Sequence, residues 1–381
     1  MNKPIFKCEL CGNEDKIYIG YRNGKPYCRR CISFIGENAD KAKISHSSFG
    51  YLKLDYKLSD DQKRISKKVL ENYIKNENTL IYAVTGAGKT ELVYEVIEYC
   101  LKRGKQVGFV IPRRDVVIEL YKRIKGAFKN YKVIAVYGGN TNDLEGQLIC
   151  LTSHQLYRYK NFFDLLIMDE IDAFPYKDNF TLNSFFKRAV KGNYILMSAT
   201  PSEKLKEEFS KKGNNMVKPF KRYHGENLPV PRLILLPLPI GFIYLVYKTL
   251  KFQKEKKPVL IFTPTISECE FLRKLLKYSV SKGFLVHSKR KDRLETIEKF
   301  RKNEYDYLVT TAVLERGVTL KNLQVIIFNA SSYIYDKDTL VQISGRVGRV
   351  IGATKGEVIY ISNKKTEAIK ESINDIKRFN K

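Results

Sequence analysis

The chain has 381 residues and carries 69 Lys and Arg against 41 Asp and Glu, a formal net charge of +28. Its length suffices for two core-bearing domains and a small appendage. Its positive excess favours a polyanionic partner such as nucleic acid, with an anionic membrane surface or simple solubility as the alternatives. The longest apolar stretch, residues 233–247, is too short to cross a bilayer and is interrupted by Pro237 and Pro239, so we expect no transmembrane segment. We find no signal peptide and no disulfide framework, and therefore expect a reduced, cytoplasmic protein.

The N-terminal region contains two Cys-x2-Cys pairs, Cys8 with Cys11 and Cys28 with Cys31, separated by 16 residues. This spacing is typical of a structural zinc site, in which four thiolates close a tetrahedron and leave no position open for catalysis. Cations and tyrosines are interleaved around the pairs, and such side chains can hold a nucleic-acid backbone and stack bases. The alternative is that zinc only folds a module too small for its own core. We assign residues 1–55 to this zinc module and the linker after it.

Residues 56–202 are predicted to form a first lobe. Apolar runs alternate there with amphipathic helices, a pattern typical of a parallel sheet covered on both faces. Besides a strand over residues 79–84, the expected strands are residues 107–111, 133–137, 148–152 and 165–168.

The strand over residues 79–84 leads into a glycine turn and then into helical spacing from Glu91. Strand, glycine turn and helix are the context of a phosphate loop, in which backbone N–H groups converge on phosphate oxygens. Lys89 would reach the terminal phosphates, and the Thr90 hydroxyl would bind magnesium. The candidate nucleotide-binding residues of this loop are Thr85, Gly86, Ala87, Gly88, Lys89 and Thr90.

Asp169 and Glu170 stand directly after the apolar run 164–168. Because ligands bind outside the carboxyl ends of parallel strands, Asp169 is placed to hold the magnesium shell and Glu170 to orient or deprotonate the attacking water. A solvated acidic turn is the alternative, but the phosphate loop upstream argues against it. Residues 198–200, Ser-Ala-Thr, follow another apolar run and are either an ordinary helix cap or hydroxyls that couple nucleotide state to the lobe interface.

Residues 203–232 are read as the passage between lobes, and residues 233–381 as a second lobe of the same α/β kind. The strands expected in it are residues 259–262, 284–287, 307–310, 325–328 and 358–361, after a strand and helix within residues 233–247. Near its end Arg346 and Arg349 are three residues apart and would share one face if the segment is helical. An arginine brought to the phosphates from another lobe stabilises charge in the transition state.

Together these segments resemble superfamily 2 helicases: residues 83–90, 169–172, 198–200 and 342–349 are similar to motifs I, II, III and VI. The resemblance implies two RecA-like lobes with a small N-terminal zinc module, and ATP and magnesium as ligands. In that superfamily an alanine at the first loop position is usual, as at Ala83. The resemblance also implies that Gln62 reads the adenine and that Gly317, in the segment similar to motif V, contacts the nucleotide.

Further segments are similar to motifs Ia, Ib, IV and V, over residues 112–114, 152–155, 261–265 and 310–319. In these motors such segments contact the nucleic-acid strand, chiefly its phosphates. The resemblance therefore assigns strand contacts to Pro112, Arg113, Arg114, Thr152, Ser153, Thr263, Thr310 and Thr311. Phosphate contacts carry no sequence information, so binding should be sequence-tolerant and salt-sensitive.

With the four cysteines included, residues 28–31, 169–176 and 314–319 resemble the ComFA family of competence proteins. That family is a cytosolic ATP-dependent DNA translocase of natural transformation. The resemblance implies single-stranded DNA as substrate, the ComEC membrane channel and a ComFC-like protein as partners, and a peripheral position on the cytosolic face of the membrane as a further option. This chain is somewhat compact for the family around its N-terminal region.

Two other functions stay open from the sequence. One is an RNA-remodelling ATPase of the DEAD-box kind. Residues 169–172 and 342–345 differ from the usual motif sequences of that group, which favours DNA as the substrate. The other is a zinc-dependent nucleic-acid-binding scaffold with a vestigial nucleotide site, against which the complete set of catalytic residues argues. The sequence leaves open the translocation polarity, strand separation and oligomeric state.

Overall fold

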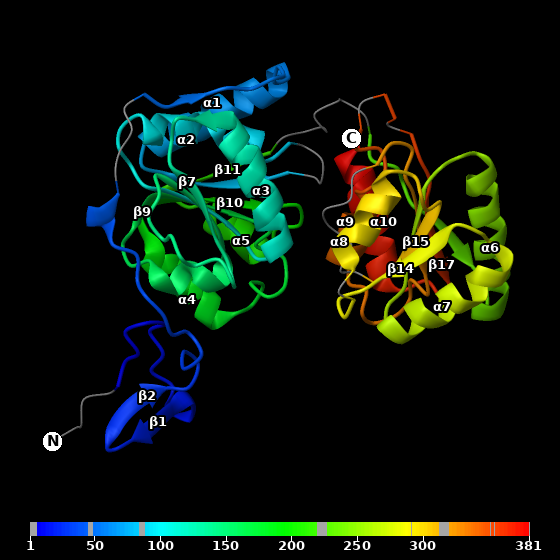
Figure 1. Cartoon of the computed structure of the whole chain (residues 1–381), viewed down its shortest axis with the longest axis horizontal. Coiled ribbons are helices and arrows are strands. Elements are labelled where there is room, and N and C mark those ends of the chain that lie inside the picture. Colours follow the sequence, from blue (N-terminus) through cyan, green and yellow to red (C-terminus); the bar gives the residue numbers. More distant parts are fainter. Residues whose placement is uncertain are drawn as a thin grey trace. The chain divides into compact units, whose positions relative to one another are not determined.

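The computed structural model describes residues 6–44, 49–83, 88–218, 227–290, 292–311, 320–350, 352–353 and 355–380. The chain divides into two compact units, the first comprising residues 1–83 and 88–219 and the second residues 84–87 and 220–381. Each unit is built on one large sheet in which every described pair of neighbouring strands is parallel (Figure 1). The predicted α/β class with two RecA-like sheets is confirmed.

The sheet of the first unit has seven strands in the order β11-β4-β10-β9-β5-β8-β7. Most of their residues are buried and apolar, as expected for strands covered on both faces. The strands are β4 (Asn78–Tyr82), β5 (Val107–Ile111), β7 (Val133–Val136), β8 (Leu148–Thr152), β9 (Phe163–Asp169), β10 (Val190–Ser198) and β11 (Asn214–Val217). The five strands predicted for this lobe are confirmed. Strand β11, by contrast, lies within residues 203–232, which the sequence analysis assigns to the passage between lobes.

Helices cover both faces of this sheet. They are α1 (Asp60–Ile74), α2 (Tyr94–Leu101), α3 (Arg114–Ala127), α4 (Phe180–Ala189) and α5 (Glu203–Glu208), with short 3-10 turns η3 (Glu91–Val93) and η4 (Ser153–Arg158). Helix α4 packs with η4 and β10 in one apolar cluster, whereas α2 and α3 pack on β5 from the other side. Side-chain caps fix three helix starts, at Ser59, Asn179 and Ser202, each accepting a hydrogen bond from the third residue of its helix.

The four-cysteine module, residues 6–40, is a small appendage of the first unit. Its regular elements are the turn η1 (Lys16–Tyr18) and an antiparallel hairpin of β1 (Ile19–Arg22) and β2 (Lys25–Cys28). After the module come η2 (Lys41–Lys43) and β3 (Tyr51–Leu52), which pairs with β6 (Phe128–Lys129). The segment predicted as a linker is therefore tied to the first unit at β3.

The sheet of the second unit has six strands in the order β12-β17-β16-β13-β15-β14. They are β12 (Arg232–Leu235), β13 (Val259–Phe262), β14 (Gly283–Val286), β15 (Tyr307–Thr310), β16 (Gln324–Phe328) and β17 (Val358–Ser362). The predicted strands of this lobe are confirmed, with differences of one residue at some ends.

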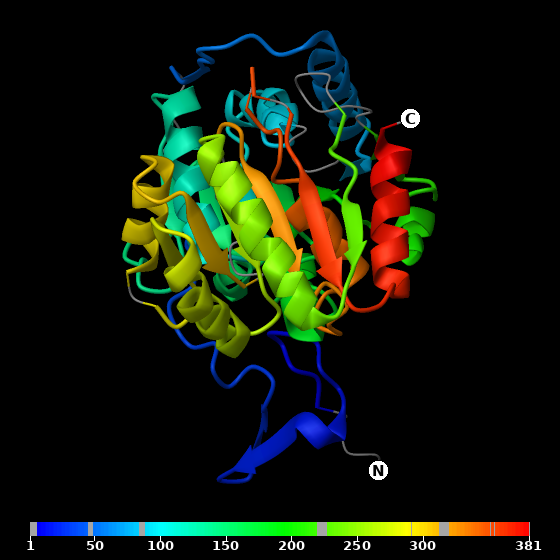
Figure 2. The ribbon, with the colours of Figure 1, turned by 90° about the vertical axis from the view of Figure 1, so that its right-hand side faces the viewer.

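Two layers of helices bury the faces of the second sheet. Helices α6 (Leu238–Lys254) and α7 (Ile266–Ser279) form one apolar cluster with it, and Figure 2 shows α6 lying across the strands. Helices α9 (Lys337–Ser344) and α10 (Glu367–Phe379) line the cluster on the opposite face, together with α8 (Arg293–Arg301). In the part of the chain that the structure describes, no helix has both the length and the apolar character needed to span a membrane.

Candidate active site

Three neighbouring strands of the first sheet bring the predicted phosphate-binding and magnesium-binding segments to one edge. In the sheet order β10 lies between β4 and β9, and parallel strands end at the same edge. Strand β4 leads toward Lys89, β9 ends at Asp169, and Ser198 ends β10. The Ala83 N–H donates to the Ser198 carbonyl (3.1 Å), which continues the pairing beyond β4.

Lys89 and Asp169 meet at this edge. The Lys89 Nζ lies 3.3 Å from Asp169 Oδ1, and each side chain is 13% exposed. The sequence predicts the first as a phosphate ligand and the second as a magnesium ligand, so their convergence puts the cation and the carboxylate at one shielded point. An anionic phosphate with its divalent cation would be electrostatically matched to the same pair.

Glu170 has a backbone conformation that non-glycine residues rarely adopt. Its φ is 61°, in the left-handed region, and its N–H donates to Asp169 Oδ1 (2.8 Å). Such strain is typical of residues whose side chain must be aimed at a functional site. The backbone N–H of Glu170 therefore holds the carboxylate of Asp169 in place.

Asp172 and Thr200 connect two of the predicted segments. The Thr200 hydroxyl donates to Asp172 Oδ2 (2.9 Å), and the Thr200 N–H donates to Ser198 Oγ (3.0 Å). Residues 198–200 thus bind the acidic turn after β9. Sequence reasoning did not single out Asp172 as a site residue; its position three residues after Asp169 is the signal that could have found it.

The described part of the phosphate loop begins again at Gly88, whose φ of +68° suits glycine. Thr90 precedes η3 and makes no side-chain capping hydrogen bond there, which leaves its hydroxyl to the role predicted for it. The other predicted nucleotide ligands Thr85, Gly86, Ala87 and Gly317 lie outside the described residues.

The first turn after the loop is anchored by a buried carboxylate. Glu91 Oε1 accepts hydrogen bonds from Arg123 Nη2 (2.6 Å) and from the Tyr56 hydroxyl (2.9 Å). Burial, followed by the Glu91 carboxylate, raises the pKa of Tyr56, so the hydroxyl stays a donor. This cluster fixes the residue next to Thr90, and the sequence alone contained no indication of it.

Gln62 has a structural role besides the predicted one. It is the third residue of α1, where its Oε1 accepts from the Ser59 N–H (3.0 Å) and its own N–H donates to Ser59 Oγ (3.2 Å). Its amide also touches the loop, because a Cβ added to Gly88 would stand 2.4 Å from Gln62 Nε2. An amide oxygen has a second lone pair and the amide nitrogen has two protons, so capping and adenine recognition are compatible.

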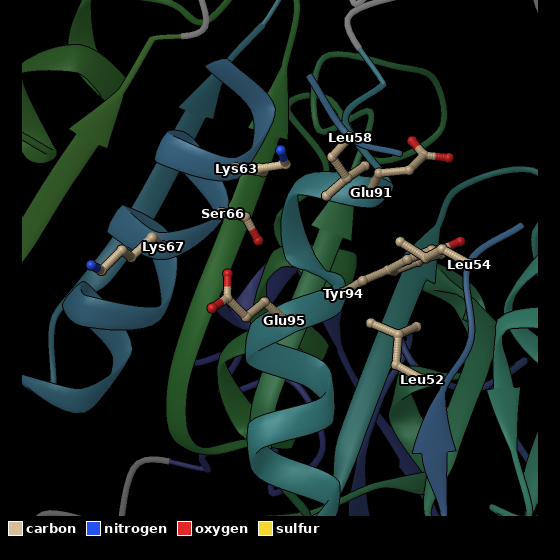
Figure 3. A pocket seen from close by; sticks show the side chains of 9 residues that line it. All are labelled: Leu52, Leu54, Leu58, Lys63, Ser66, Lys67, Glu91, Tyr94 and Glu95. Carbon is tan, nitrogen blue, oxygen red and sulfur yellow. The ribbon is translucent and has the colours of Figure 1, made fainter. Parts of the chain in front are cut away.

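A cavity of about 340 Å³ lies beside these residues, between α1 and α2 (Figure 3). Its walls are mainly apolar, with charged groups of both signs among them. It is lined by Leu52, Leu54, Leu58, Lys63, Ser66, Lys67, Glu91, Tyr94 and Glu95. Apolar walls with a few polar groups are the usual lining of a small-molecule site. The lining includes Lys63 and Glu91, the sequence neighbours of Gln62 and Thr90, but none of the predicted nucleotide ligands among the described residues.

The two candidate arginines of the second unit do not lie on a helix. Helix α9 ends at Ser344, and Arg346 and Arg349 belong to the turns that follow, with Gly348 at a φ of 70°. The condition under which the two arginines would share one helix face is therefore not met. Arg346 is 1% exposed, and the Arg349 Nε donates to the Gly345 carbonyl (2.9 Å). Their contact with a nucleotide stays a prediction.

The candidate strand-binding residues of the first unit follow the adjacent strands β5 and β8. Arg113 precedes the first residue of α3, and the exposed Arg114 lies over the Tyr137 ring (5.1 Å to its centre). Pro112 is buried, as are Thr152 (6% exposed) and Ser153 (0%). These arginines can offer side chains to a strand, whereas the three buried residues have little exposed surface to offer one.

In the second unit, Thr263, Thr310 and Thr311 end strands β13 and β15 and are buried. The Thr263 N–H donates to the Thr310 carbonyl (2.8 Å), and the Thr310 hydroxyl donates to the Thr311 carbonyl (3.1 Å). The N–H and hydroxyl of Thr263 and the hydroxyl of Thr310 are therefore engaged within the protein. The contact of these three residues with a nucleic-acid strand stays a prediction.

The four cysteines form one compact cluster. All four are buried, and their sulfur atoms lie within 4.8 Å of one another, with Cys8 and Cys31 at 4.0 Å and Cys11 and Cys28 at 3.8 Å. Sulfur atoms at about 2.3 Å from one tetrahedral zinc ion would stand about 3.8 Å apart. Burial raises the pKa of Cys11, and a bound cation would offset that cost by stabilising its thiolate. The donor set therefore fits a structural metal site.

Comparisons with known proteins identify the family. The chain is 35% identical over 408 residues to the competence protein ComFA of Bacillus subtilis (strain 168), covering 100% of this chain and 87% of that protein. The chain belongs to the ComFA family. It is also 33% identical over 377 residues to ComFA of Streptococcus pneumoniae (strain ATCC BAA-255 / R6), covering 94% of this chain and 86% of that protein.

Two family profiles match successive parts of the chain. Residues 55–203 match the type III restriction enzyme, res subunit, and residues 242–351 match the helicase conserved C-terminal domain. This ComFA-family chain is thus an ATP-hydrolysing superfamily 2 helicase that binds nucleic acid and is related to competence.

Solved structures show the same fold. S. cerevisiae Dbp5 bound to RNA and ADP BeF3 superposes with a TM-score of 0.63 at 16% identity, covering 84% of this chain and 91% of that one. The DEAD-box helicase Mss116 bound to ssRNA and UDP-BeF gives 0.65 at 19% identity, covering 84% and 77%. At these identities the likeness concerns the fold alone.

Proposed function

We propose that this ComFA-family helicase is an ATP-driven translocase that moves single-stranded DNA during DNA uptake in natural transformation. The observation that best supports ATP hydrolysis is the contact of Lys89 Nζ with Asp169 Oδ1, at 3.3 Å, on the carboxyl edge of the first sheet. The family membership and the formal charge of +28 support DNA as the substrate that is moved.

ATP is held by residues of the first unit in this proposal. Lys89 binds the terminal phosphates, and Thr90 and Asp169 hold the magnesium that neutralises them. Glu170 orients the water that attacks the terminal phosphorus. Arg346 and Arg349 of the second unit neutralise the charge that develops on the transferred phosphoryl group, and Gln62 reads the adenine.

The strand is held mainly through its phosphates. Arg113 and Arg114 supply cations, and the segments around Thr152, Thr263 and Thr310 contact the same strand, as the family resemblance implies. Binding that depends on phosphates releases counterions, so affinity falls steeply with salt and varies little with base sequence. We propose zinc as the metal of the four-cysteine cluster, and the ComEC channel and a ComFC-like protein as partners.

The test is steady-state ATP hydrolysis at one fixed salt concentration with no nucleic acid, single-stranded DNA, duplex DNA or RNA. Strong stimulation by single-stranded DNA supports the proposal. Stimulation by RNA alone would assign the chain to RNA remodelling, and absence of hydrolysis in every mixture would assign it to a binding scaffold. Lys89→Ala serves as the control for contaminating ATPases.

A further inference from the structure

The four-cysteine module is fastened to the segment that follows β8. That segment is η4, and it begins immediately after Thr152, where the predicted strand-binding edge of the first unit lies. The part of the module in contact with it is residues 34–39, which we call the docking segment.

Phe34 is the ring that anchors the docking segment. Its ring centre lies 4.8 Å from that of Phe185 and 5.6 Å from that of Tyr157, both edge-on, and it stacks with His154 at 6.2 Å and 18°. His154 and Tyr157 belong to η4, whereas Phe185 belongs to α4. Aromatic pairs in these geometries contribute beyond the area they bury, so Phe34 holds η4 from one side.

Hydrogen bonds to main-chain groups of the docking segment extend the contact along it. The Tyr157 hydroxyl donates to the Ile35 carbonyl (2.9 Å) and Arg158 Nη1 donates to the Glu37 carbonyl (2.6 Å). The Ala39 N–H in turn donates to the Arg158 carbonyl (3.1 Å). Both ends of the docking segment are therefore tied to the last two residues of η4.

The approach between the two segments is too close for a side chain. A Cβ built on Gly36 would lie 2.6 Å from Arg158 Nη1 and 2.8 Å from the Tyr157 hydroxyl oxygen. On its other side η4 is held by the body of the unit, because Arg188 Nη1 donates to the Tyr157 carbonyl (2.8 Å). Thus η4 is fixed between α4 and the docking segment.

The anchor is also connected to the metal ligands. The Phe34 N–H donates to the Cys31 carbonyl (2.9 Å). Nearby, the Arg30 guanidinium lies over the rings of Tyr18 (3.7 Å) and Phe180 (4.9 Å), the latter being the first residue of α4. A change in the turn that carries Cys31 would therefore move Phe34 directly.

We propose that the docking segment positions the strand-binding end of β8 and couples the state of the four-cysteine site to nucleic-acid affinity. Phe34 is a positioning residue in this account: it acts on the strand through His154 and η4. The proposal rests on the proposed function, in which the segment around Thr152 contacts the DNA strand.

The test compares Phe34→Ala with Ile35→Ala in the full-length chain. The Ile35 side chain is 81% exposed, so its truncation removes a neighbouring apolar group without removing a contact of the docking segment. Each purified variant is assayed for metal content, ATP hydrolysis without nucleic acid, and affinity for a fluorescent single-stranded oligonucleotide. Hydrogen exchange of residues 152–158 is measured in parallel.

For Phe34→Ala we expect wild-type metal content and unstimulated ATP hydrolysis, faster exchange in residues 152–158, and a Kd for DNA raised about tenfold, ~1.4 kcal/mol. Ile35→Ala should bind DNA like the wild type, and Phe34→Tyr should restore most of the affinity. Wild-type DNA affinity in a metal-loaded Phe34→Ala protein would overturn the coupling.

Two further outcomes keep the test decisive. If Phe34→Ala does not fold, Tyr157→Phe removes only the hydrogen bond to Ile35 and should still weaken DNA binding measurably; unchanged affinity would overturn the coupling. If instead the wild-type chain binds no single-stranded DNA, the proposed function itself fails, which is distinguishable from equal binding by wild type and variant.

Discussion

The nucleotide edge of the first sheet and the four-cysteine cluster hold their functional residues in opposite ways. At the nucleotide edge, Lys89 and Asp169 form an ion pair of two unlike groups that an incoming phosphate and cation can divide between them. In the cysteine cluster four like groups are buried together and share one coordination geometry. The first arrangement suits repeated exchange of ligand, and the second suits a permanent structural role.

The difference predicts which substitutions remove activity and which remove structure. Lys89→Ala should leave the fold intact, because the side chain belongs to no apolar cluster, but should lower ATP turnover about a thousandfold through loss of phosphate binding and charge stabilisation. Turnover is measured with a coupled assay and folding by circular dichroism. A folded variant with wild-type turnover would break the assignment of the nucleotide edge.

Cys31→Ser should disturb local structure and leave most of the basal ATP hydrolysis intact, the opposite of what we expect for Lys89→Ala. Loss of one thiolate should release the metal and unfold residues 6–40 locally, since a small module without its metal has little core. We expect metal content near zero and faster proteolysis of the N-terminal region, while ATP hydrolysis without DNA falls less than about threefold. Loss of that basal hydrolysis together with the metal would show that the two regions are not separable in this way.

Thr200→Val tests the link within the nucleotide edge. It removes the hydroxyl that donates to Asp172 Oδ2 and keeps the shape of the side chain. A hydrogen bond to a charged group is worth about 1.5–3 kcal/mol, so we expect DNA-stimulated ATP hydrolysis to fall about tenfold with little change in the KM for ATP. Thr200→Ser is the matched control and should keep most of the activity; equal losses in both variants would contradict the role of the hydroxyl.

The smallest expected effect concerns Asp164 in β9, far from the chemistry. Burial alone would raise its pKa, but the Gln106 N–H and the Lys191 ammonium outweigh burial and hold the pKa below its usual value. A depressed pKa means that this carboxylate stabilises the fold above the unfolded-state pKa of about 4, and that the contribution is lost as pH falls below it.

Asp164→Asn should therefore reduce the loss of unfolding free energy that the protein shows on acidification. Because Asp164 is one of many carboxylates, we expect only a small part of that loss to disappear. The measurement is urea unfolding at pH 7 and at about pH 3, below the unfolded-state pKa. An unchanged difference between the two pH values would show that Asp164 carries none of the acid sensitivity.

The strands of both sheets could be predicted because parallel strands buried on both faces appear in the sequence as short apolar runs. The ranges 107–111 and 259–262 have the same bounds in the structure. Strand β11 could not be predicted: it begins with Asn214 and Asn215, and its place beside β4 depends on a partner more than a hundred residues away. Local pattern contains no information on such pairing.

The residues of the candidate site also divide into those that the sequence could predict and those that it could not. Lys89 and Asp169 could be predicted because each follows a strand, and the edge they share follows from parallel topology. The burial of Ser153 and Thr310 could not, since a hydroxyl that binds backbone and one that faces solvent look alike in the sequence. Nor could the contact of Phe34 with His154, which depends on how two separate segments pack.

The most direct test of ATP-driven translocation is displacement of streptavidin from biotinylated single-stranded DNA, with the biotin at either end of the same oligonucleotide. A translocase should displace streptavidin from one end in the presence of ATP and magnesium, and from neither end with Glu170→Gln or without ATP. Hydrolysis stimulated by single-stranded DNA with no displacement from either end would contradict translocation, since the ATPase would then be coupled to something other than movement along the strand.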